Sequence, residues 1–284
     1  MVRHGVAEAS KRDTGPSADE DAPRPAAWER LADAMLSVPL GALAELGVLM
    51  RLLYEVVRWG LRPPYRGRQL LDAMEFVGVQ SIYIVGLTGL FVGAVFGLQL
   101  VDGFRQLGAE NQVGSVVSLA LARELAPVFS ALMITSRAGS AIATELGSMR
   151  VSSQIDALTT MSVSPVQYLV VPRVVAGLFM VPVMALLFFL VGLSGAYGVA
   201  VELFGLDGGI FLERARWYVD GGDLLQGAVK AAIFGVAVTL ISCREGFYAG
   251  GGAAGVGRAT NRAVVHSSIS VLVLDYVVTA MFVR

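Results

Sequence analysis

The 284-residue chain is 55% hydrophobic and only 16% charged, whereas roughly 25% of the residues of a typical soluble domain are charged. This balance, with a mean hydropathy of +0.65, excludes an ordinary soluble protein and indicates an integral membrane protein. The net charge of −1 gives no sign of nucleic-acid binding, and the single cysteine, Cys243, excludes an internal disulfide.

The chain begins with a region that is too charged to cross a membrane. Residues 1–27 are rich in Ala, Pro, Asp and Glu and lack the apolar core of a signal peptide, which predicts a disordered cytoplasmic tail. In residues 28–59, apolar side chains recur at helical spacing between charged ones, which predicts an amphipathic helix in the cytoplasmic interface. A break at 62–64 and a short elbow at 68–75 follow, so we expect 28–75 to form an interfacial region.

Five apolar runs follow the elbow. Each is long enough to cross the hydrocarbon core, which takes roughly 20 helical residues. We therefore expect an all-α membrane protein in which residues 76–284 form the transmembrane domain. Its five spans should lie at about 76–101, 113–147, 174–201, 224–243 and 263–283.

The first apolar run carries a glycine at every fourth position. Gly89, Gly93 and Gly97 form a GxxxGxxxG pattern, which creates a surface that another helix can approach closely. The pattern is equally consistent with packing inside the chain and with contact between two copies.

The second apolar run carries charges in its outer half. Arg123 and Glu124 lie there, and charges within a membrane segment are costly and usually face a protein interior or a cavity. The two residues either line a cavity for an amphiphile or form a local ion pair that anchors the helix. Lys230 and Asp275, inside later runs, could pair with each other or with Arg123.

A short amphipathic element connects the second and third runs. Val151, Ile155 and Leu158 share one face of a helix over 151–161. Between two spans, such a helix suits insertion into the groove of a partner outside the membrane. A solvated connector would have the same length, so the pattern alone leaves both interpretations open.

The placement of arginines indicates the orientation. The regions before the first run, after the second and after the fourth are rich in arginine, whereas the opposite loops hold only Arg105, Arg214 and Arg216. The positive-inside rule then puts the N-terminus, the loop at 148–173 and a Gly-rich loop at 244–262 in the cytoplasm.

Two further sequence patterns resemble catalytic or nucleotide-binding motifs but do not fit them. One resembles a phosphate-binding loop, and the other a serine–histidine pair of a protease. Gly252 to Gly257 has the spacing of a phosphate loop, but Arg258-Ala259 follows where Lys and Ser/Thr are required. Ser194 would lie about 30 Å and His266 only about 6 Å from the cytoplasmic face, so their depths do not match those of a catalytic pair. We expect any nucleotide chemistry to come from a partner.

Several motifs resemble those of the MlaE-type permease family, the membrane subunits of ABC lipid transporters that work with MCE-domain proteins. The resemblance covers about Leu46 to Val283, with small departures at Ala126, at Thr135-Ser136 and at Ser153. The segments that carry it are RELAPV at 123–128, RAGSA at 137–141, ELGSM at 145–149, QIDAL at 154–158, RAT at 258–260 and VVHSS at 264–268.

The resemblance implies a homodimeric, multi-pass permease in the bacterial inner membrane, with its N-terminus in the cytoplasm and a phospholipid bound between the copies. A cytoplasmic ABC ATPase dimer would bind ATP and Mg, and a periplasmic MCE-domain hexamer would exchange lipid. The chain itself would be non-catalytic and would need no cofactor, metal or nucleic acid. The implied lipid-binding residues are Gly93, Gly97, Leu98, Arg123, Glu124 and Leu125, and the implied ATPase-coupling residues are Glu145, Arg150, Val151, Gln154, Ile155, Asp156 and Leu158.

An ion-coupled secondary transporter that uses Glu124, Lys230 and Asp275 is the alternative from another class. Such folds often show inverted repeats and interrupted helices in matching halves. Five spans and no visible internal repeat count against this interpretation.

Overall fold

The structure of the protein, a computed structural model, describes residues 47–63 and 66–282. The expected tail at 1–27 and most of the expected helix at 28–59 lie outside these residues; the described part of that helix covers residues 47–60. From Val48 onward the chain forms one compact unit, and the regular secondary structure of its described residues is helical. The all-α prediction is therefore confirmed.

Five helical segments are long and apolar enough to cross a membrane, and they match the five expected spans. The first three segments are each built from several consecutive elements. In chain order the elements are α2 (Gly67–Val77), η1 (Val79–Ser81), α3 (Ile82–Arg105), η2 (Glu110–Gln112), α4 (Val113–Ala120), η3 (Leu121–Leu125), α5 (Ala126–Ile134), η4 (Thr135–Gly139), α6 (Ser140–Val151), α7 (Gln154–Thr160), η5 (Val166–Val170), α8 (Val171–Tyr197), η6 (Gly198–Leu203), α9 (Gly208–Tyr218), α10 (Gly221–Phe247) and α11 (Gly252–Phe282).

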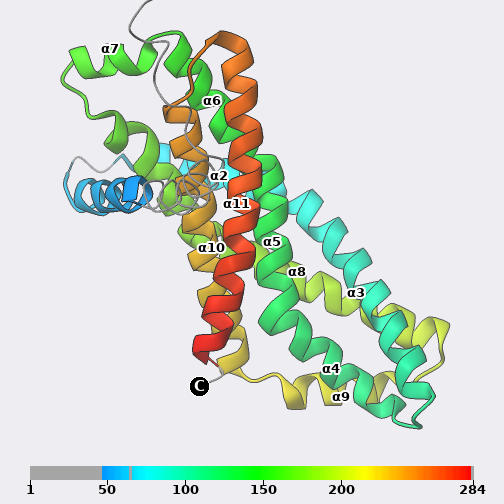
Figure 1. The fold of residues 1–284 in the computed structure, drawn as a ribbon. Helices are drawn as coiled ribbons and strands as arrows, with labels where there is room; N and C mark the ends of the chain where they lie inside the picture. Colours follow the sequence, from blue (N-terminus) through cyan, green and yellow to red (C-terminus); the bar gives the residue numbers. More distant parts are fainter. Residues whose placement is uncertain (1–46, 64–65, 283–284) are drawn as a thin grey trace, which may run out of the picture. The chain divides into compact units, whose positions relative to one another are not determined.

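The helix α8 is the element around which the others are arranged. It packs against α3, α10, α2 and α5. The helix α10 runs along α11, and both contact α6, as can be followed in Figure 1. Because α8 and α10 carry the largest sets of buried residues, the core lies where these two helices meet their neighbours.

Glycines allow α3 to approach α8 closely. Gly89, Gly93 and Gly97 are all buried. A Cβ at Gly93 would overlap the carbonyl oxygen of Gly192 on α8, and a Cβ at Gly97 would lie 3.0 Å from the Cα of Ala196. The GxxxGxxxG surface of the first span therefore packs inside the chain, which decides between the two interpretations of this motif.

The second segment is not a uniform helix, because the π-turns η3 and η4 interrupt it. Arg123 and Glu124 fall in η3 and Arg137 falls in η4. Single π-turns inside α-helices often occur at functional sites. The Arg137 guanidinium donates hydrogen bonds to the carbonyl oxygen of Phe76 and to Ser81 Oγ, so η4 holds the turn between α2 and α3.

Two connections differ from those expected. The region 202–223, expected as a polar loop, contains α9, which is capped where Asp207 accepts a hydrogen bond from the backbone N–H of Ile210 at 2.9 Å. The prediction of a Gly-rich loop over 244–262 is wrong. The helix α10 continues to Phe247 and α11 begins at Gly252, so only a short connection remains between them. Gly251 and Gly252 adopt φ values of 83° and 67°, which make a very short turn possible.

The short helix expected over 151–161 is present but shorter, as α7 (Gln154–Thr160). Val151 belongs to the end of α6, and Ser153 adopts a φ of 58° between the two helices, so Val151 does not share a helix face with Ile155 and Leu158 as expected. The corner between α6 and α7 is held by an ion pair in which Arg150 Nη1 lies 2.5 Å from Asp156 Oδ1. Ile155 is buried within the chain, Leu158 is half-buried and Gln154 is exposed. The face that α7 leaves free is therefore more polar than the sequence pattern suggested.

The α3–α8 contact generates a stability prediction. We expect Gly93→Ala to lower the free energy of unfolding by about 1–3 kcal/mol, because the added methyl group must push two backbones apart. Gly86→Ala on the same helix is the control, since a Cβ there meets nothing within 4 Å. The measurement is the thermal unfolding of both variants in the same detergent, and equal midpoints would contradict this account of the contact.

Candidate functional site

A buried lysine joins three of the membrane-spanning segments. Lys230 on α10 is 0% exposed, and its ammonium lies 2.6 Å from Glu124 Oε2 in η3 and 3.2 Å from Asp275 Oδ1 on α11. It also donates a hydrogen bond to the carbonyl oxygen of Arg123 at 3.1 Å. An ammonium has three N–H donors, so all three are used and Lys230 is fully paired in the interior.

Local chain chemistry explains why that backbone acceptor is available. In an α-helix the carbonyl oxygen of Arg123 would accept from the N–H four residues later, but that residue is Pro127, which has none. Lys230 donates to this carbonyl oxygen instead. The proline thus helps to fix the position of the lysine.

Arg123 is directed toward a different carboxylate. Its Nε donates a hydrogen bond to Asp223 Oδ1 at 2.6 Å. Asp223 is 7% exposed, whereas the Arg123 side chain is 45% exposed. Of the two cations in this region, Lys230 is enclosed and Arg123 is open to the surface, so Arg123 is the cation that an anionic group can reach.

The sequence analysis missed Asp223. Asp220 and Asp223 form the capping box of α10: Asp220 Oδ1 accepts from the N–H of Asp223 at 2.9 Å, and Asp223 Oδ2 accepts from the N–H of Asp220 at 3.1 Å. Two acidic residues three positions apart, just before an apolar run, are a sequence pattern that could have predicted this capping box. This cap places Asp223 against the start of the membrane segment, where Arg123 meets it.

The other residues implied in lipid binding are spread over different surfaces. Gly93 and Gly97 are buried against α8. Leu98 is exposed on α3, and Leu125 is half-buried in η3. The structure therefore brings Arg123 and Glu124 together with Asp223, Lys230 and Asp275, and it uses the two glycines for helix packing.

A second polar region lies at the opposite ends of these helices, near α7. The Arg173 guanidinium lies 2.8 Å from Glu145 Oε2, which joins α8 to α6. Arg173 also donates a hydrogen bond to the carbonyl oxygen of Leu169 at 2.6 Å. The implied coupling residues Glu145 and Arg150 thus hold α6 in place, one against α8 and the other against α7.

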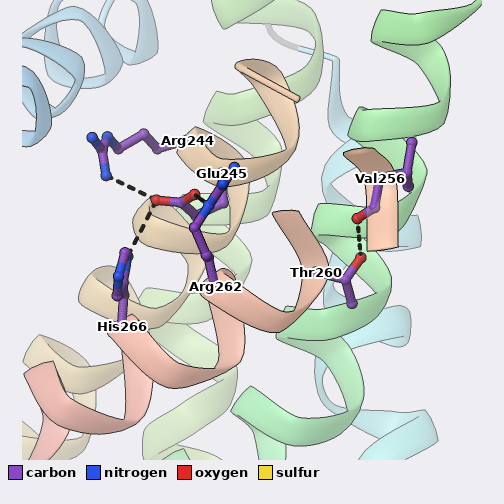
Figure 2. Close-up of polar contacts among 6 residues, drawn as sticks. All are labelled: Arg244, Glu245, Val256, Thr260, Arg262 and His266. Carbon is purple, nitrogen blue, oxygen red and sulfur yellow. Dashed lines mark hydrogen bonds and ion pairs between the residues drawn. The ribbon is translucent and has the colours of Figure 1, made fainter. Parts of the chain in front are cut away.

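Glu245 on α10 is a buried carboxylate that was not predicted from the sequence, and Figure 2 shows its polar contacts. Glu245 on α10 accepts hydrogen bonds from Arg244 Nη1 at 2.8 Å and from Arg262 Nε at 3.0 Å. His266 Nδ1 lies 3.3 Å from the same carboxylate. The cluster joins α10 to α11. It was missed because this stretch was taken for a loop, in which residues 17 and 21 positions apart have no fixed relation.

The two patterns set aside in the sequence analysis have other roles. Gly252 to Gly257 lie in the first turns of α11, so they form a helix and not a phosphate loop. Ser194 Oγ donates a hydrogen bond to the carbonyl oxygen of Val191 on its own helix, while His266 faces Glu245. Within residues 47–63 and 66–282, no group of three His, Cys, Asp or Glu side chains could hold a metal ion.

Comparison with known proteins places these features in a family. The model of the family "Permease MlaE" matches residues 70–281. A probable ABC transporter permease protein of Rickettsia felis is 41% identical over 224 residues, which cover 79% of this chain and 86% of the relative.

Two further relatives carry more specific names. The intermembrane phospholipid transport system permease protein MlaE of Haemophilus influenzae is 40% identical over 213 residues, or 75% of this chain and 82% of the relative. The chloroplastic protein TRIGALACTOSYLDIACYLGLYCEROL 1 of Arabidopsis thaliana is 34% identical over 247 residues, or 87% and 67% of the two chains. The resemblance seen in the motifs is confirmed, and the chain belongs to the MlaE permease family, the non-catalytic membrane subunits of ABC transporters.

Proposed function

We propose that this permease moves phospholipids between the bacterial inner membrane and a periplasmic MCE-domain carrier. The observation that carries the proposal is Arg123, whose half-exposed side chain lies in a membrane-spanning segment, whereas the neighbouring cation Lys230 on α10 is fully enclosed. A phospholipid needs an apolar wall and a donor for its phosphate, and a guanidinium binds phosphate well. The name of the Haemophilus relative, an intermembrane phospholipid transport permease, supports the same substrate.

The assembly that we propose is a homodimer with an ATPase dimer and an MCE-domain hexamer. An ABC permease works with an ATPase, so ATP and Mg belong to that partner. In this proposal α7 docks the ATPase in the cytoplasm, and the exposed residues in and beside it, among them Val151, Gln154 and Asp156, form the contact. The ion pairs Glu145–Arg173 and Arg150–Asp156 would carry movement of α7 to α6 and α8.

The ion-coupled alternative has lost its support. The chain belongs to a family of ABC transporter permeases, in which ATP hydrolysis supplies the energy for transport. Glu124, Lys230 and Asp275, on which the alternative rests, form a cluster in which each of the three N–H donors of the lysine has an acceptor. Their evident role is to join η3, α10 and α11.

One prediction concerns the lipid site. We expect Arg123→Ala to lower lipid transfer about ten- to a hundredfold, because a hydrogen bond to a charged group contributes about 1.5–3 kcal/mol. The measurement is ATP-driven transfer of labelled phospholipid by the complete complex in proteoliposomes.

A matched control for this variant is Arg105→Ala. Arg105 pairs with Glu110 and has a similarly exposed side chain (47%) but lies at the end of α3. We expect the Arg105 variant to transfer lipid at the original rate. An unchanged rate for Arg123→Ala in an intact complex would show that Arg123 has no part in lipid binding.

Another prediction concerns orientation and docking. We expect a cysteine introduced as Gln154→Cys to react with a membrane-impermeant thiol reagent only from the cytoplasmic side, and to be protected when the ATPase is bound. Trp217→Cys in α9, where Trp217 is 81% exposed, should react only from the outer side. The native Cys243 is buried and should not interfere.

The labelling is measured in right-side-out and inverted vesicles, with and without the ATPase. Labelling of both positions from one side would overturn the orientation. If Gln154→Cys is labelled equally with and without the ATPase, the docking role of α7 is contradicted, but the proposed orientation is not.

A further inference from the structure

A polar pocket lies between α2, the last turns of α6 and the beginning of α8, and we call it the α2 pocket. It has a volume of about 410 Å³, within the range of about 300–1,000 Å³ that is typical of ligand pockets. Its polar and charged lining residues are Gln69 and Asp72 on α2, Glu145 on α6, Tyr168 in η5 and Arg173 on α8. Because α2 packs against α8 and the Glu145–Arg173 pair joins α8 to α6, its walls are held together.

The α2 pocket lies on the side of the membrane that we assign to the ATPase. Met149, Tyr168 and Arg173 line it, and they belong to the region 148–173, which also contains α7 and which the positive-inside rule puts in the cytoplasm. The helix α2 lies in the half of Figure 1 that contains α7, away from α9. The ATPase is the partner that an ABC permease meets on this side.

The α2 pocket presents hydrogen-bond acceptors that lack a donor. Gln69 Oε1 is buried and has no hydrogen-bond partner within residues 47–63 and 66–282. Asp72 is exposed, and its carboxylate forms no ion pair or hydrogen bond with another described residue. Residues three positions apart share one face of a helix, so both acceptors belong to the same face of α2. A buried acceptor without a donor is unfavourable and rare in native structures.

The charges that line the α2 pocket leave one carboxylate uncompensated. Arg173 is the cation among the lining residues, and its guanidinium lies 2.8 Å from Glu145 Oε2. These two charges cancel. Asp72 therefore gives the pocket a net negative charge, and an incoming group that carries a positive charge and several N–H donors would complement it.

The remaining walls of the α2 pocket suit the stem of a long basic side chain. Phe76, Tyr168 and Met149 contribute apolar surface. Arg137 and Arg66 lie over the rings of Phe76 and Tyr168, at 5.0 and 4.5 Å from the ring centroids, but neither lines the pocket. Lysine and arginine pack their apolar stems along such surfaces while their charged ends reach polar groups.

We propose that the α2 pocket receives a lysine or arginine side chain of the ATPase, as a contact separate from α7. Its N–H groups would donate to Gln69 Oε1 and to the Asp72 carboxylate. This inference rests on the proposed docking of the ATPase and adds a second contact to it. Because α2 leads through η1 into α3, this contact would connect the ATPase to the first span, whereas α7 connects it to the second and third.

The test measures the dissociation constant of the ATPase that co-purifies with the permease. The labelled ATPase is titrated against the full-length permease in phosphatidylcholine nanodiscs. We expect Asp72→Asn to weaken ATPase binding about tenfold, because a hydrogen bond between charged groups becomes one to a neutral group. Asp72→Glu, which keeps the charge, should bind close to the original affinity. Asp72→Lys, which places two cations together, should weaken binding further than Asp72→Asn.

The matched control is Glu75→Gln on the same helix. Glu75 is exposed like Asp72 but does not line the α2 pocket, so this variant should bind the ATPase as the original permease does. An unchanged dissociation constant for Asp72→Asn would overturn the proposal. Equal weakening by Asp72→Asn and Glu75→Gln would indicate a general attraction to the charge of α2 and would also overturn it.

The same variants show whether a lipid amine occupies the α2 pocket instead. The headgroup of phosphatidylethanolamine has N–H donors, whereas that of phosphatidylcholine has none. Thermal unfolding of the permease without the ATPase is compared in nanodiscs of the two lipids. A midpoint that is higher in phosphatidylethanolamine for the original permease but not for Asp72→Asn, with unchanged ATPase binding, would assign the pocket to a lipid and contradict the proposal.

Thiol labelling separates this inference from the docking role of α7. If the ATPase protects Gln154→Cys while Asp72→Asn binds the ATPase normally, docking through α7 stands and the α2 pocket is not a contact. If the ATPase leaves Gln154→Cys unprotected and its binding does not depend on Asp72, both proposals fail.

Discussion

The structure depends on how a lysine ammonium is accommodated among membrane-spanning helices. An unpaired charge in such an interior is strongly unfavourable, and removing one partner of a buried pair commonly costs about 3–5 kcal/mol. Lys230 on α10 avoids this cost only if η3 and α11 both lie where their acceptors reach its ammonium. The polar cluster therefore sets the arrangement of three segments at once, which apolar packing in a membrane specifies poorly.

Close backbone packing fixes the remaining helices. α8 meets α3 at Gly93 and Gly192 and meets α10 at Gly177 and Gly235, where side chains would overlap the neighbouring backbone. The polar contacts and the glycine contacts share α10. The half-exposed Arg123 is consequently held through Asp223 against the helix that these glycine contacts fix in place.

Much of this architecture could be predicted from the sequence, because span length, glycine spacing and proline position are local properties. The five segments and the short helix α7 were predicted in this way. The partners of Lys230 could not be chosen, since residues 45 and 106 positions away along the chain meet only after folding. The contacts of Asp223 and Glu245 also join residues that are distant in the sequence, so their roles were not predicted. For Asp223, the spacing of Asp220 and Asp223 was a local signal of a capping box. The Gly-rich stretch at 244–262 was wrongly predicted as a loop, because glycine is compatible both with a loop and with the start of a helix.

The compensation of charge around Lys230 has an electrical consequence. Glu124, Lys230 and Asp275 together carry one net negative charge, and Arg123 and Asp223 cancel. A membrane potential of 100 mV acts on one elementary charge with about 2.3 kcal/mol over the full bilayer, whose core is about 30 Å thick. A movement of the cluster by about 3 Å would thus couple to only ~0.2 kcal/mol, less than thermal energy. The membrane voltage therefore exerts little force on a movement of this cluster.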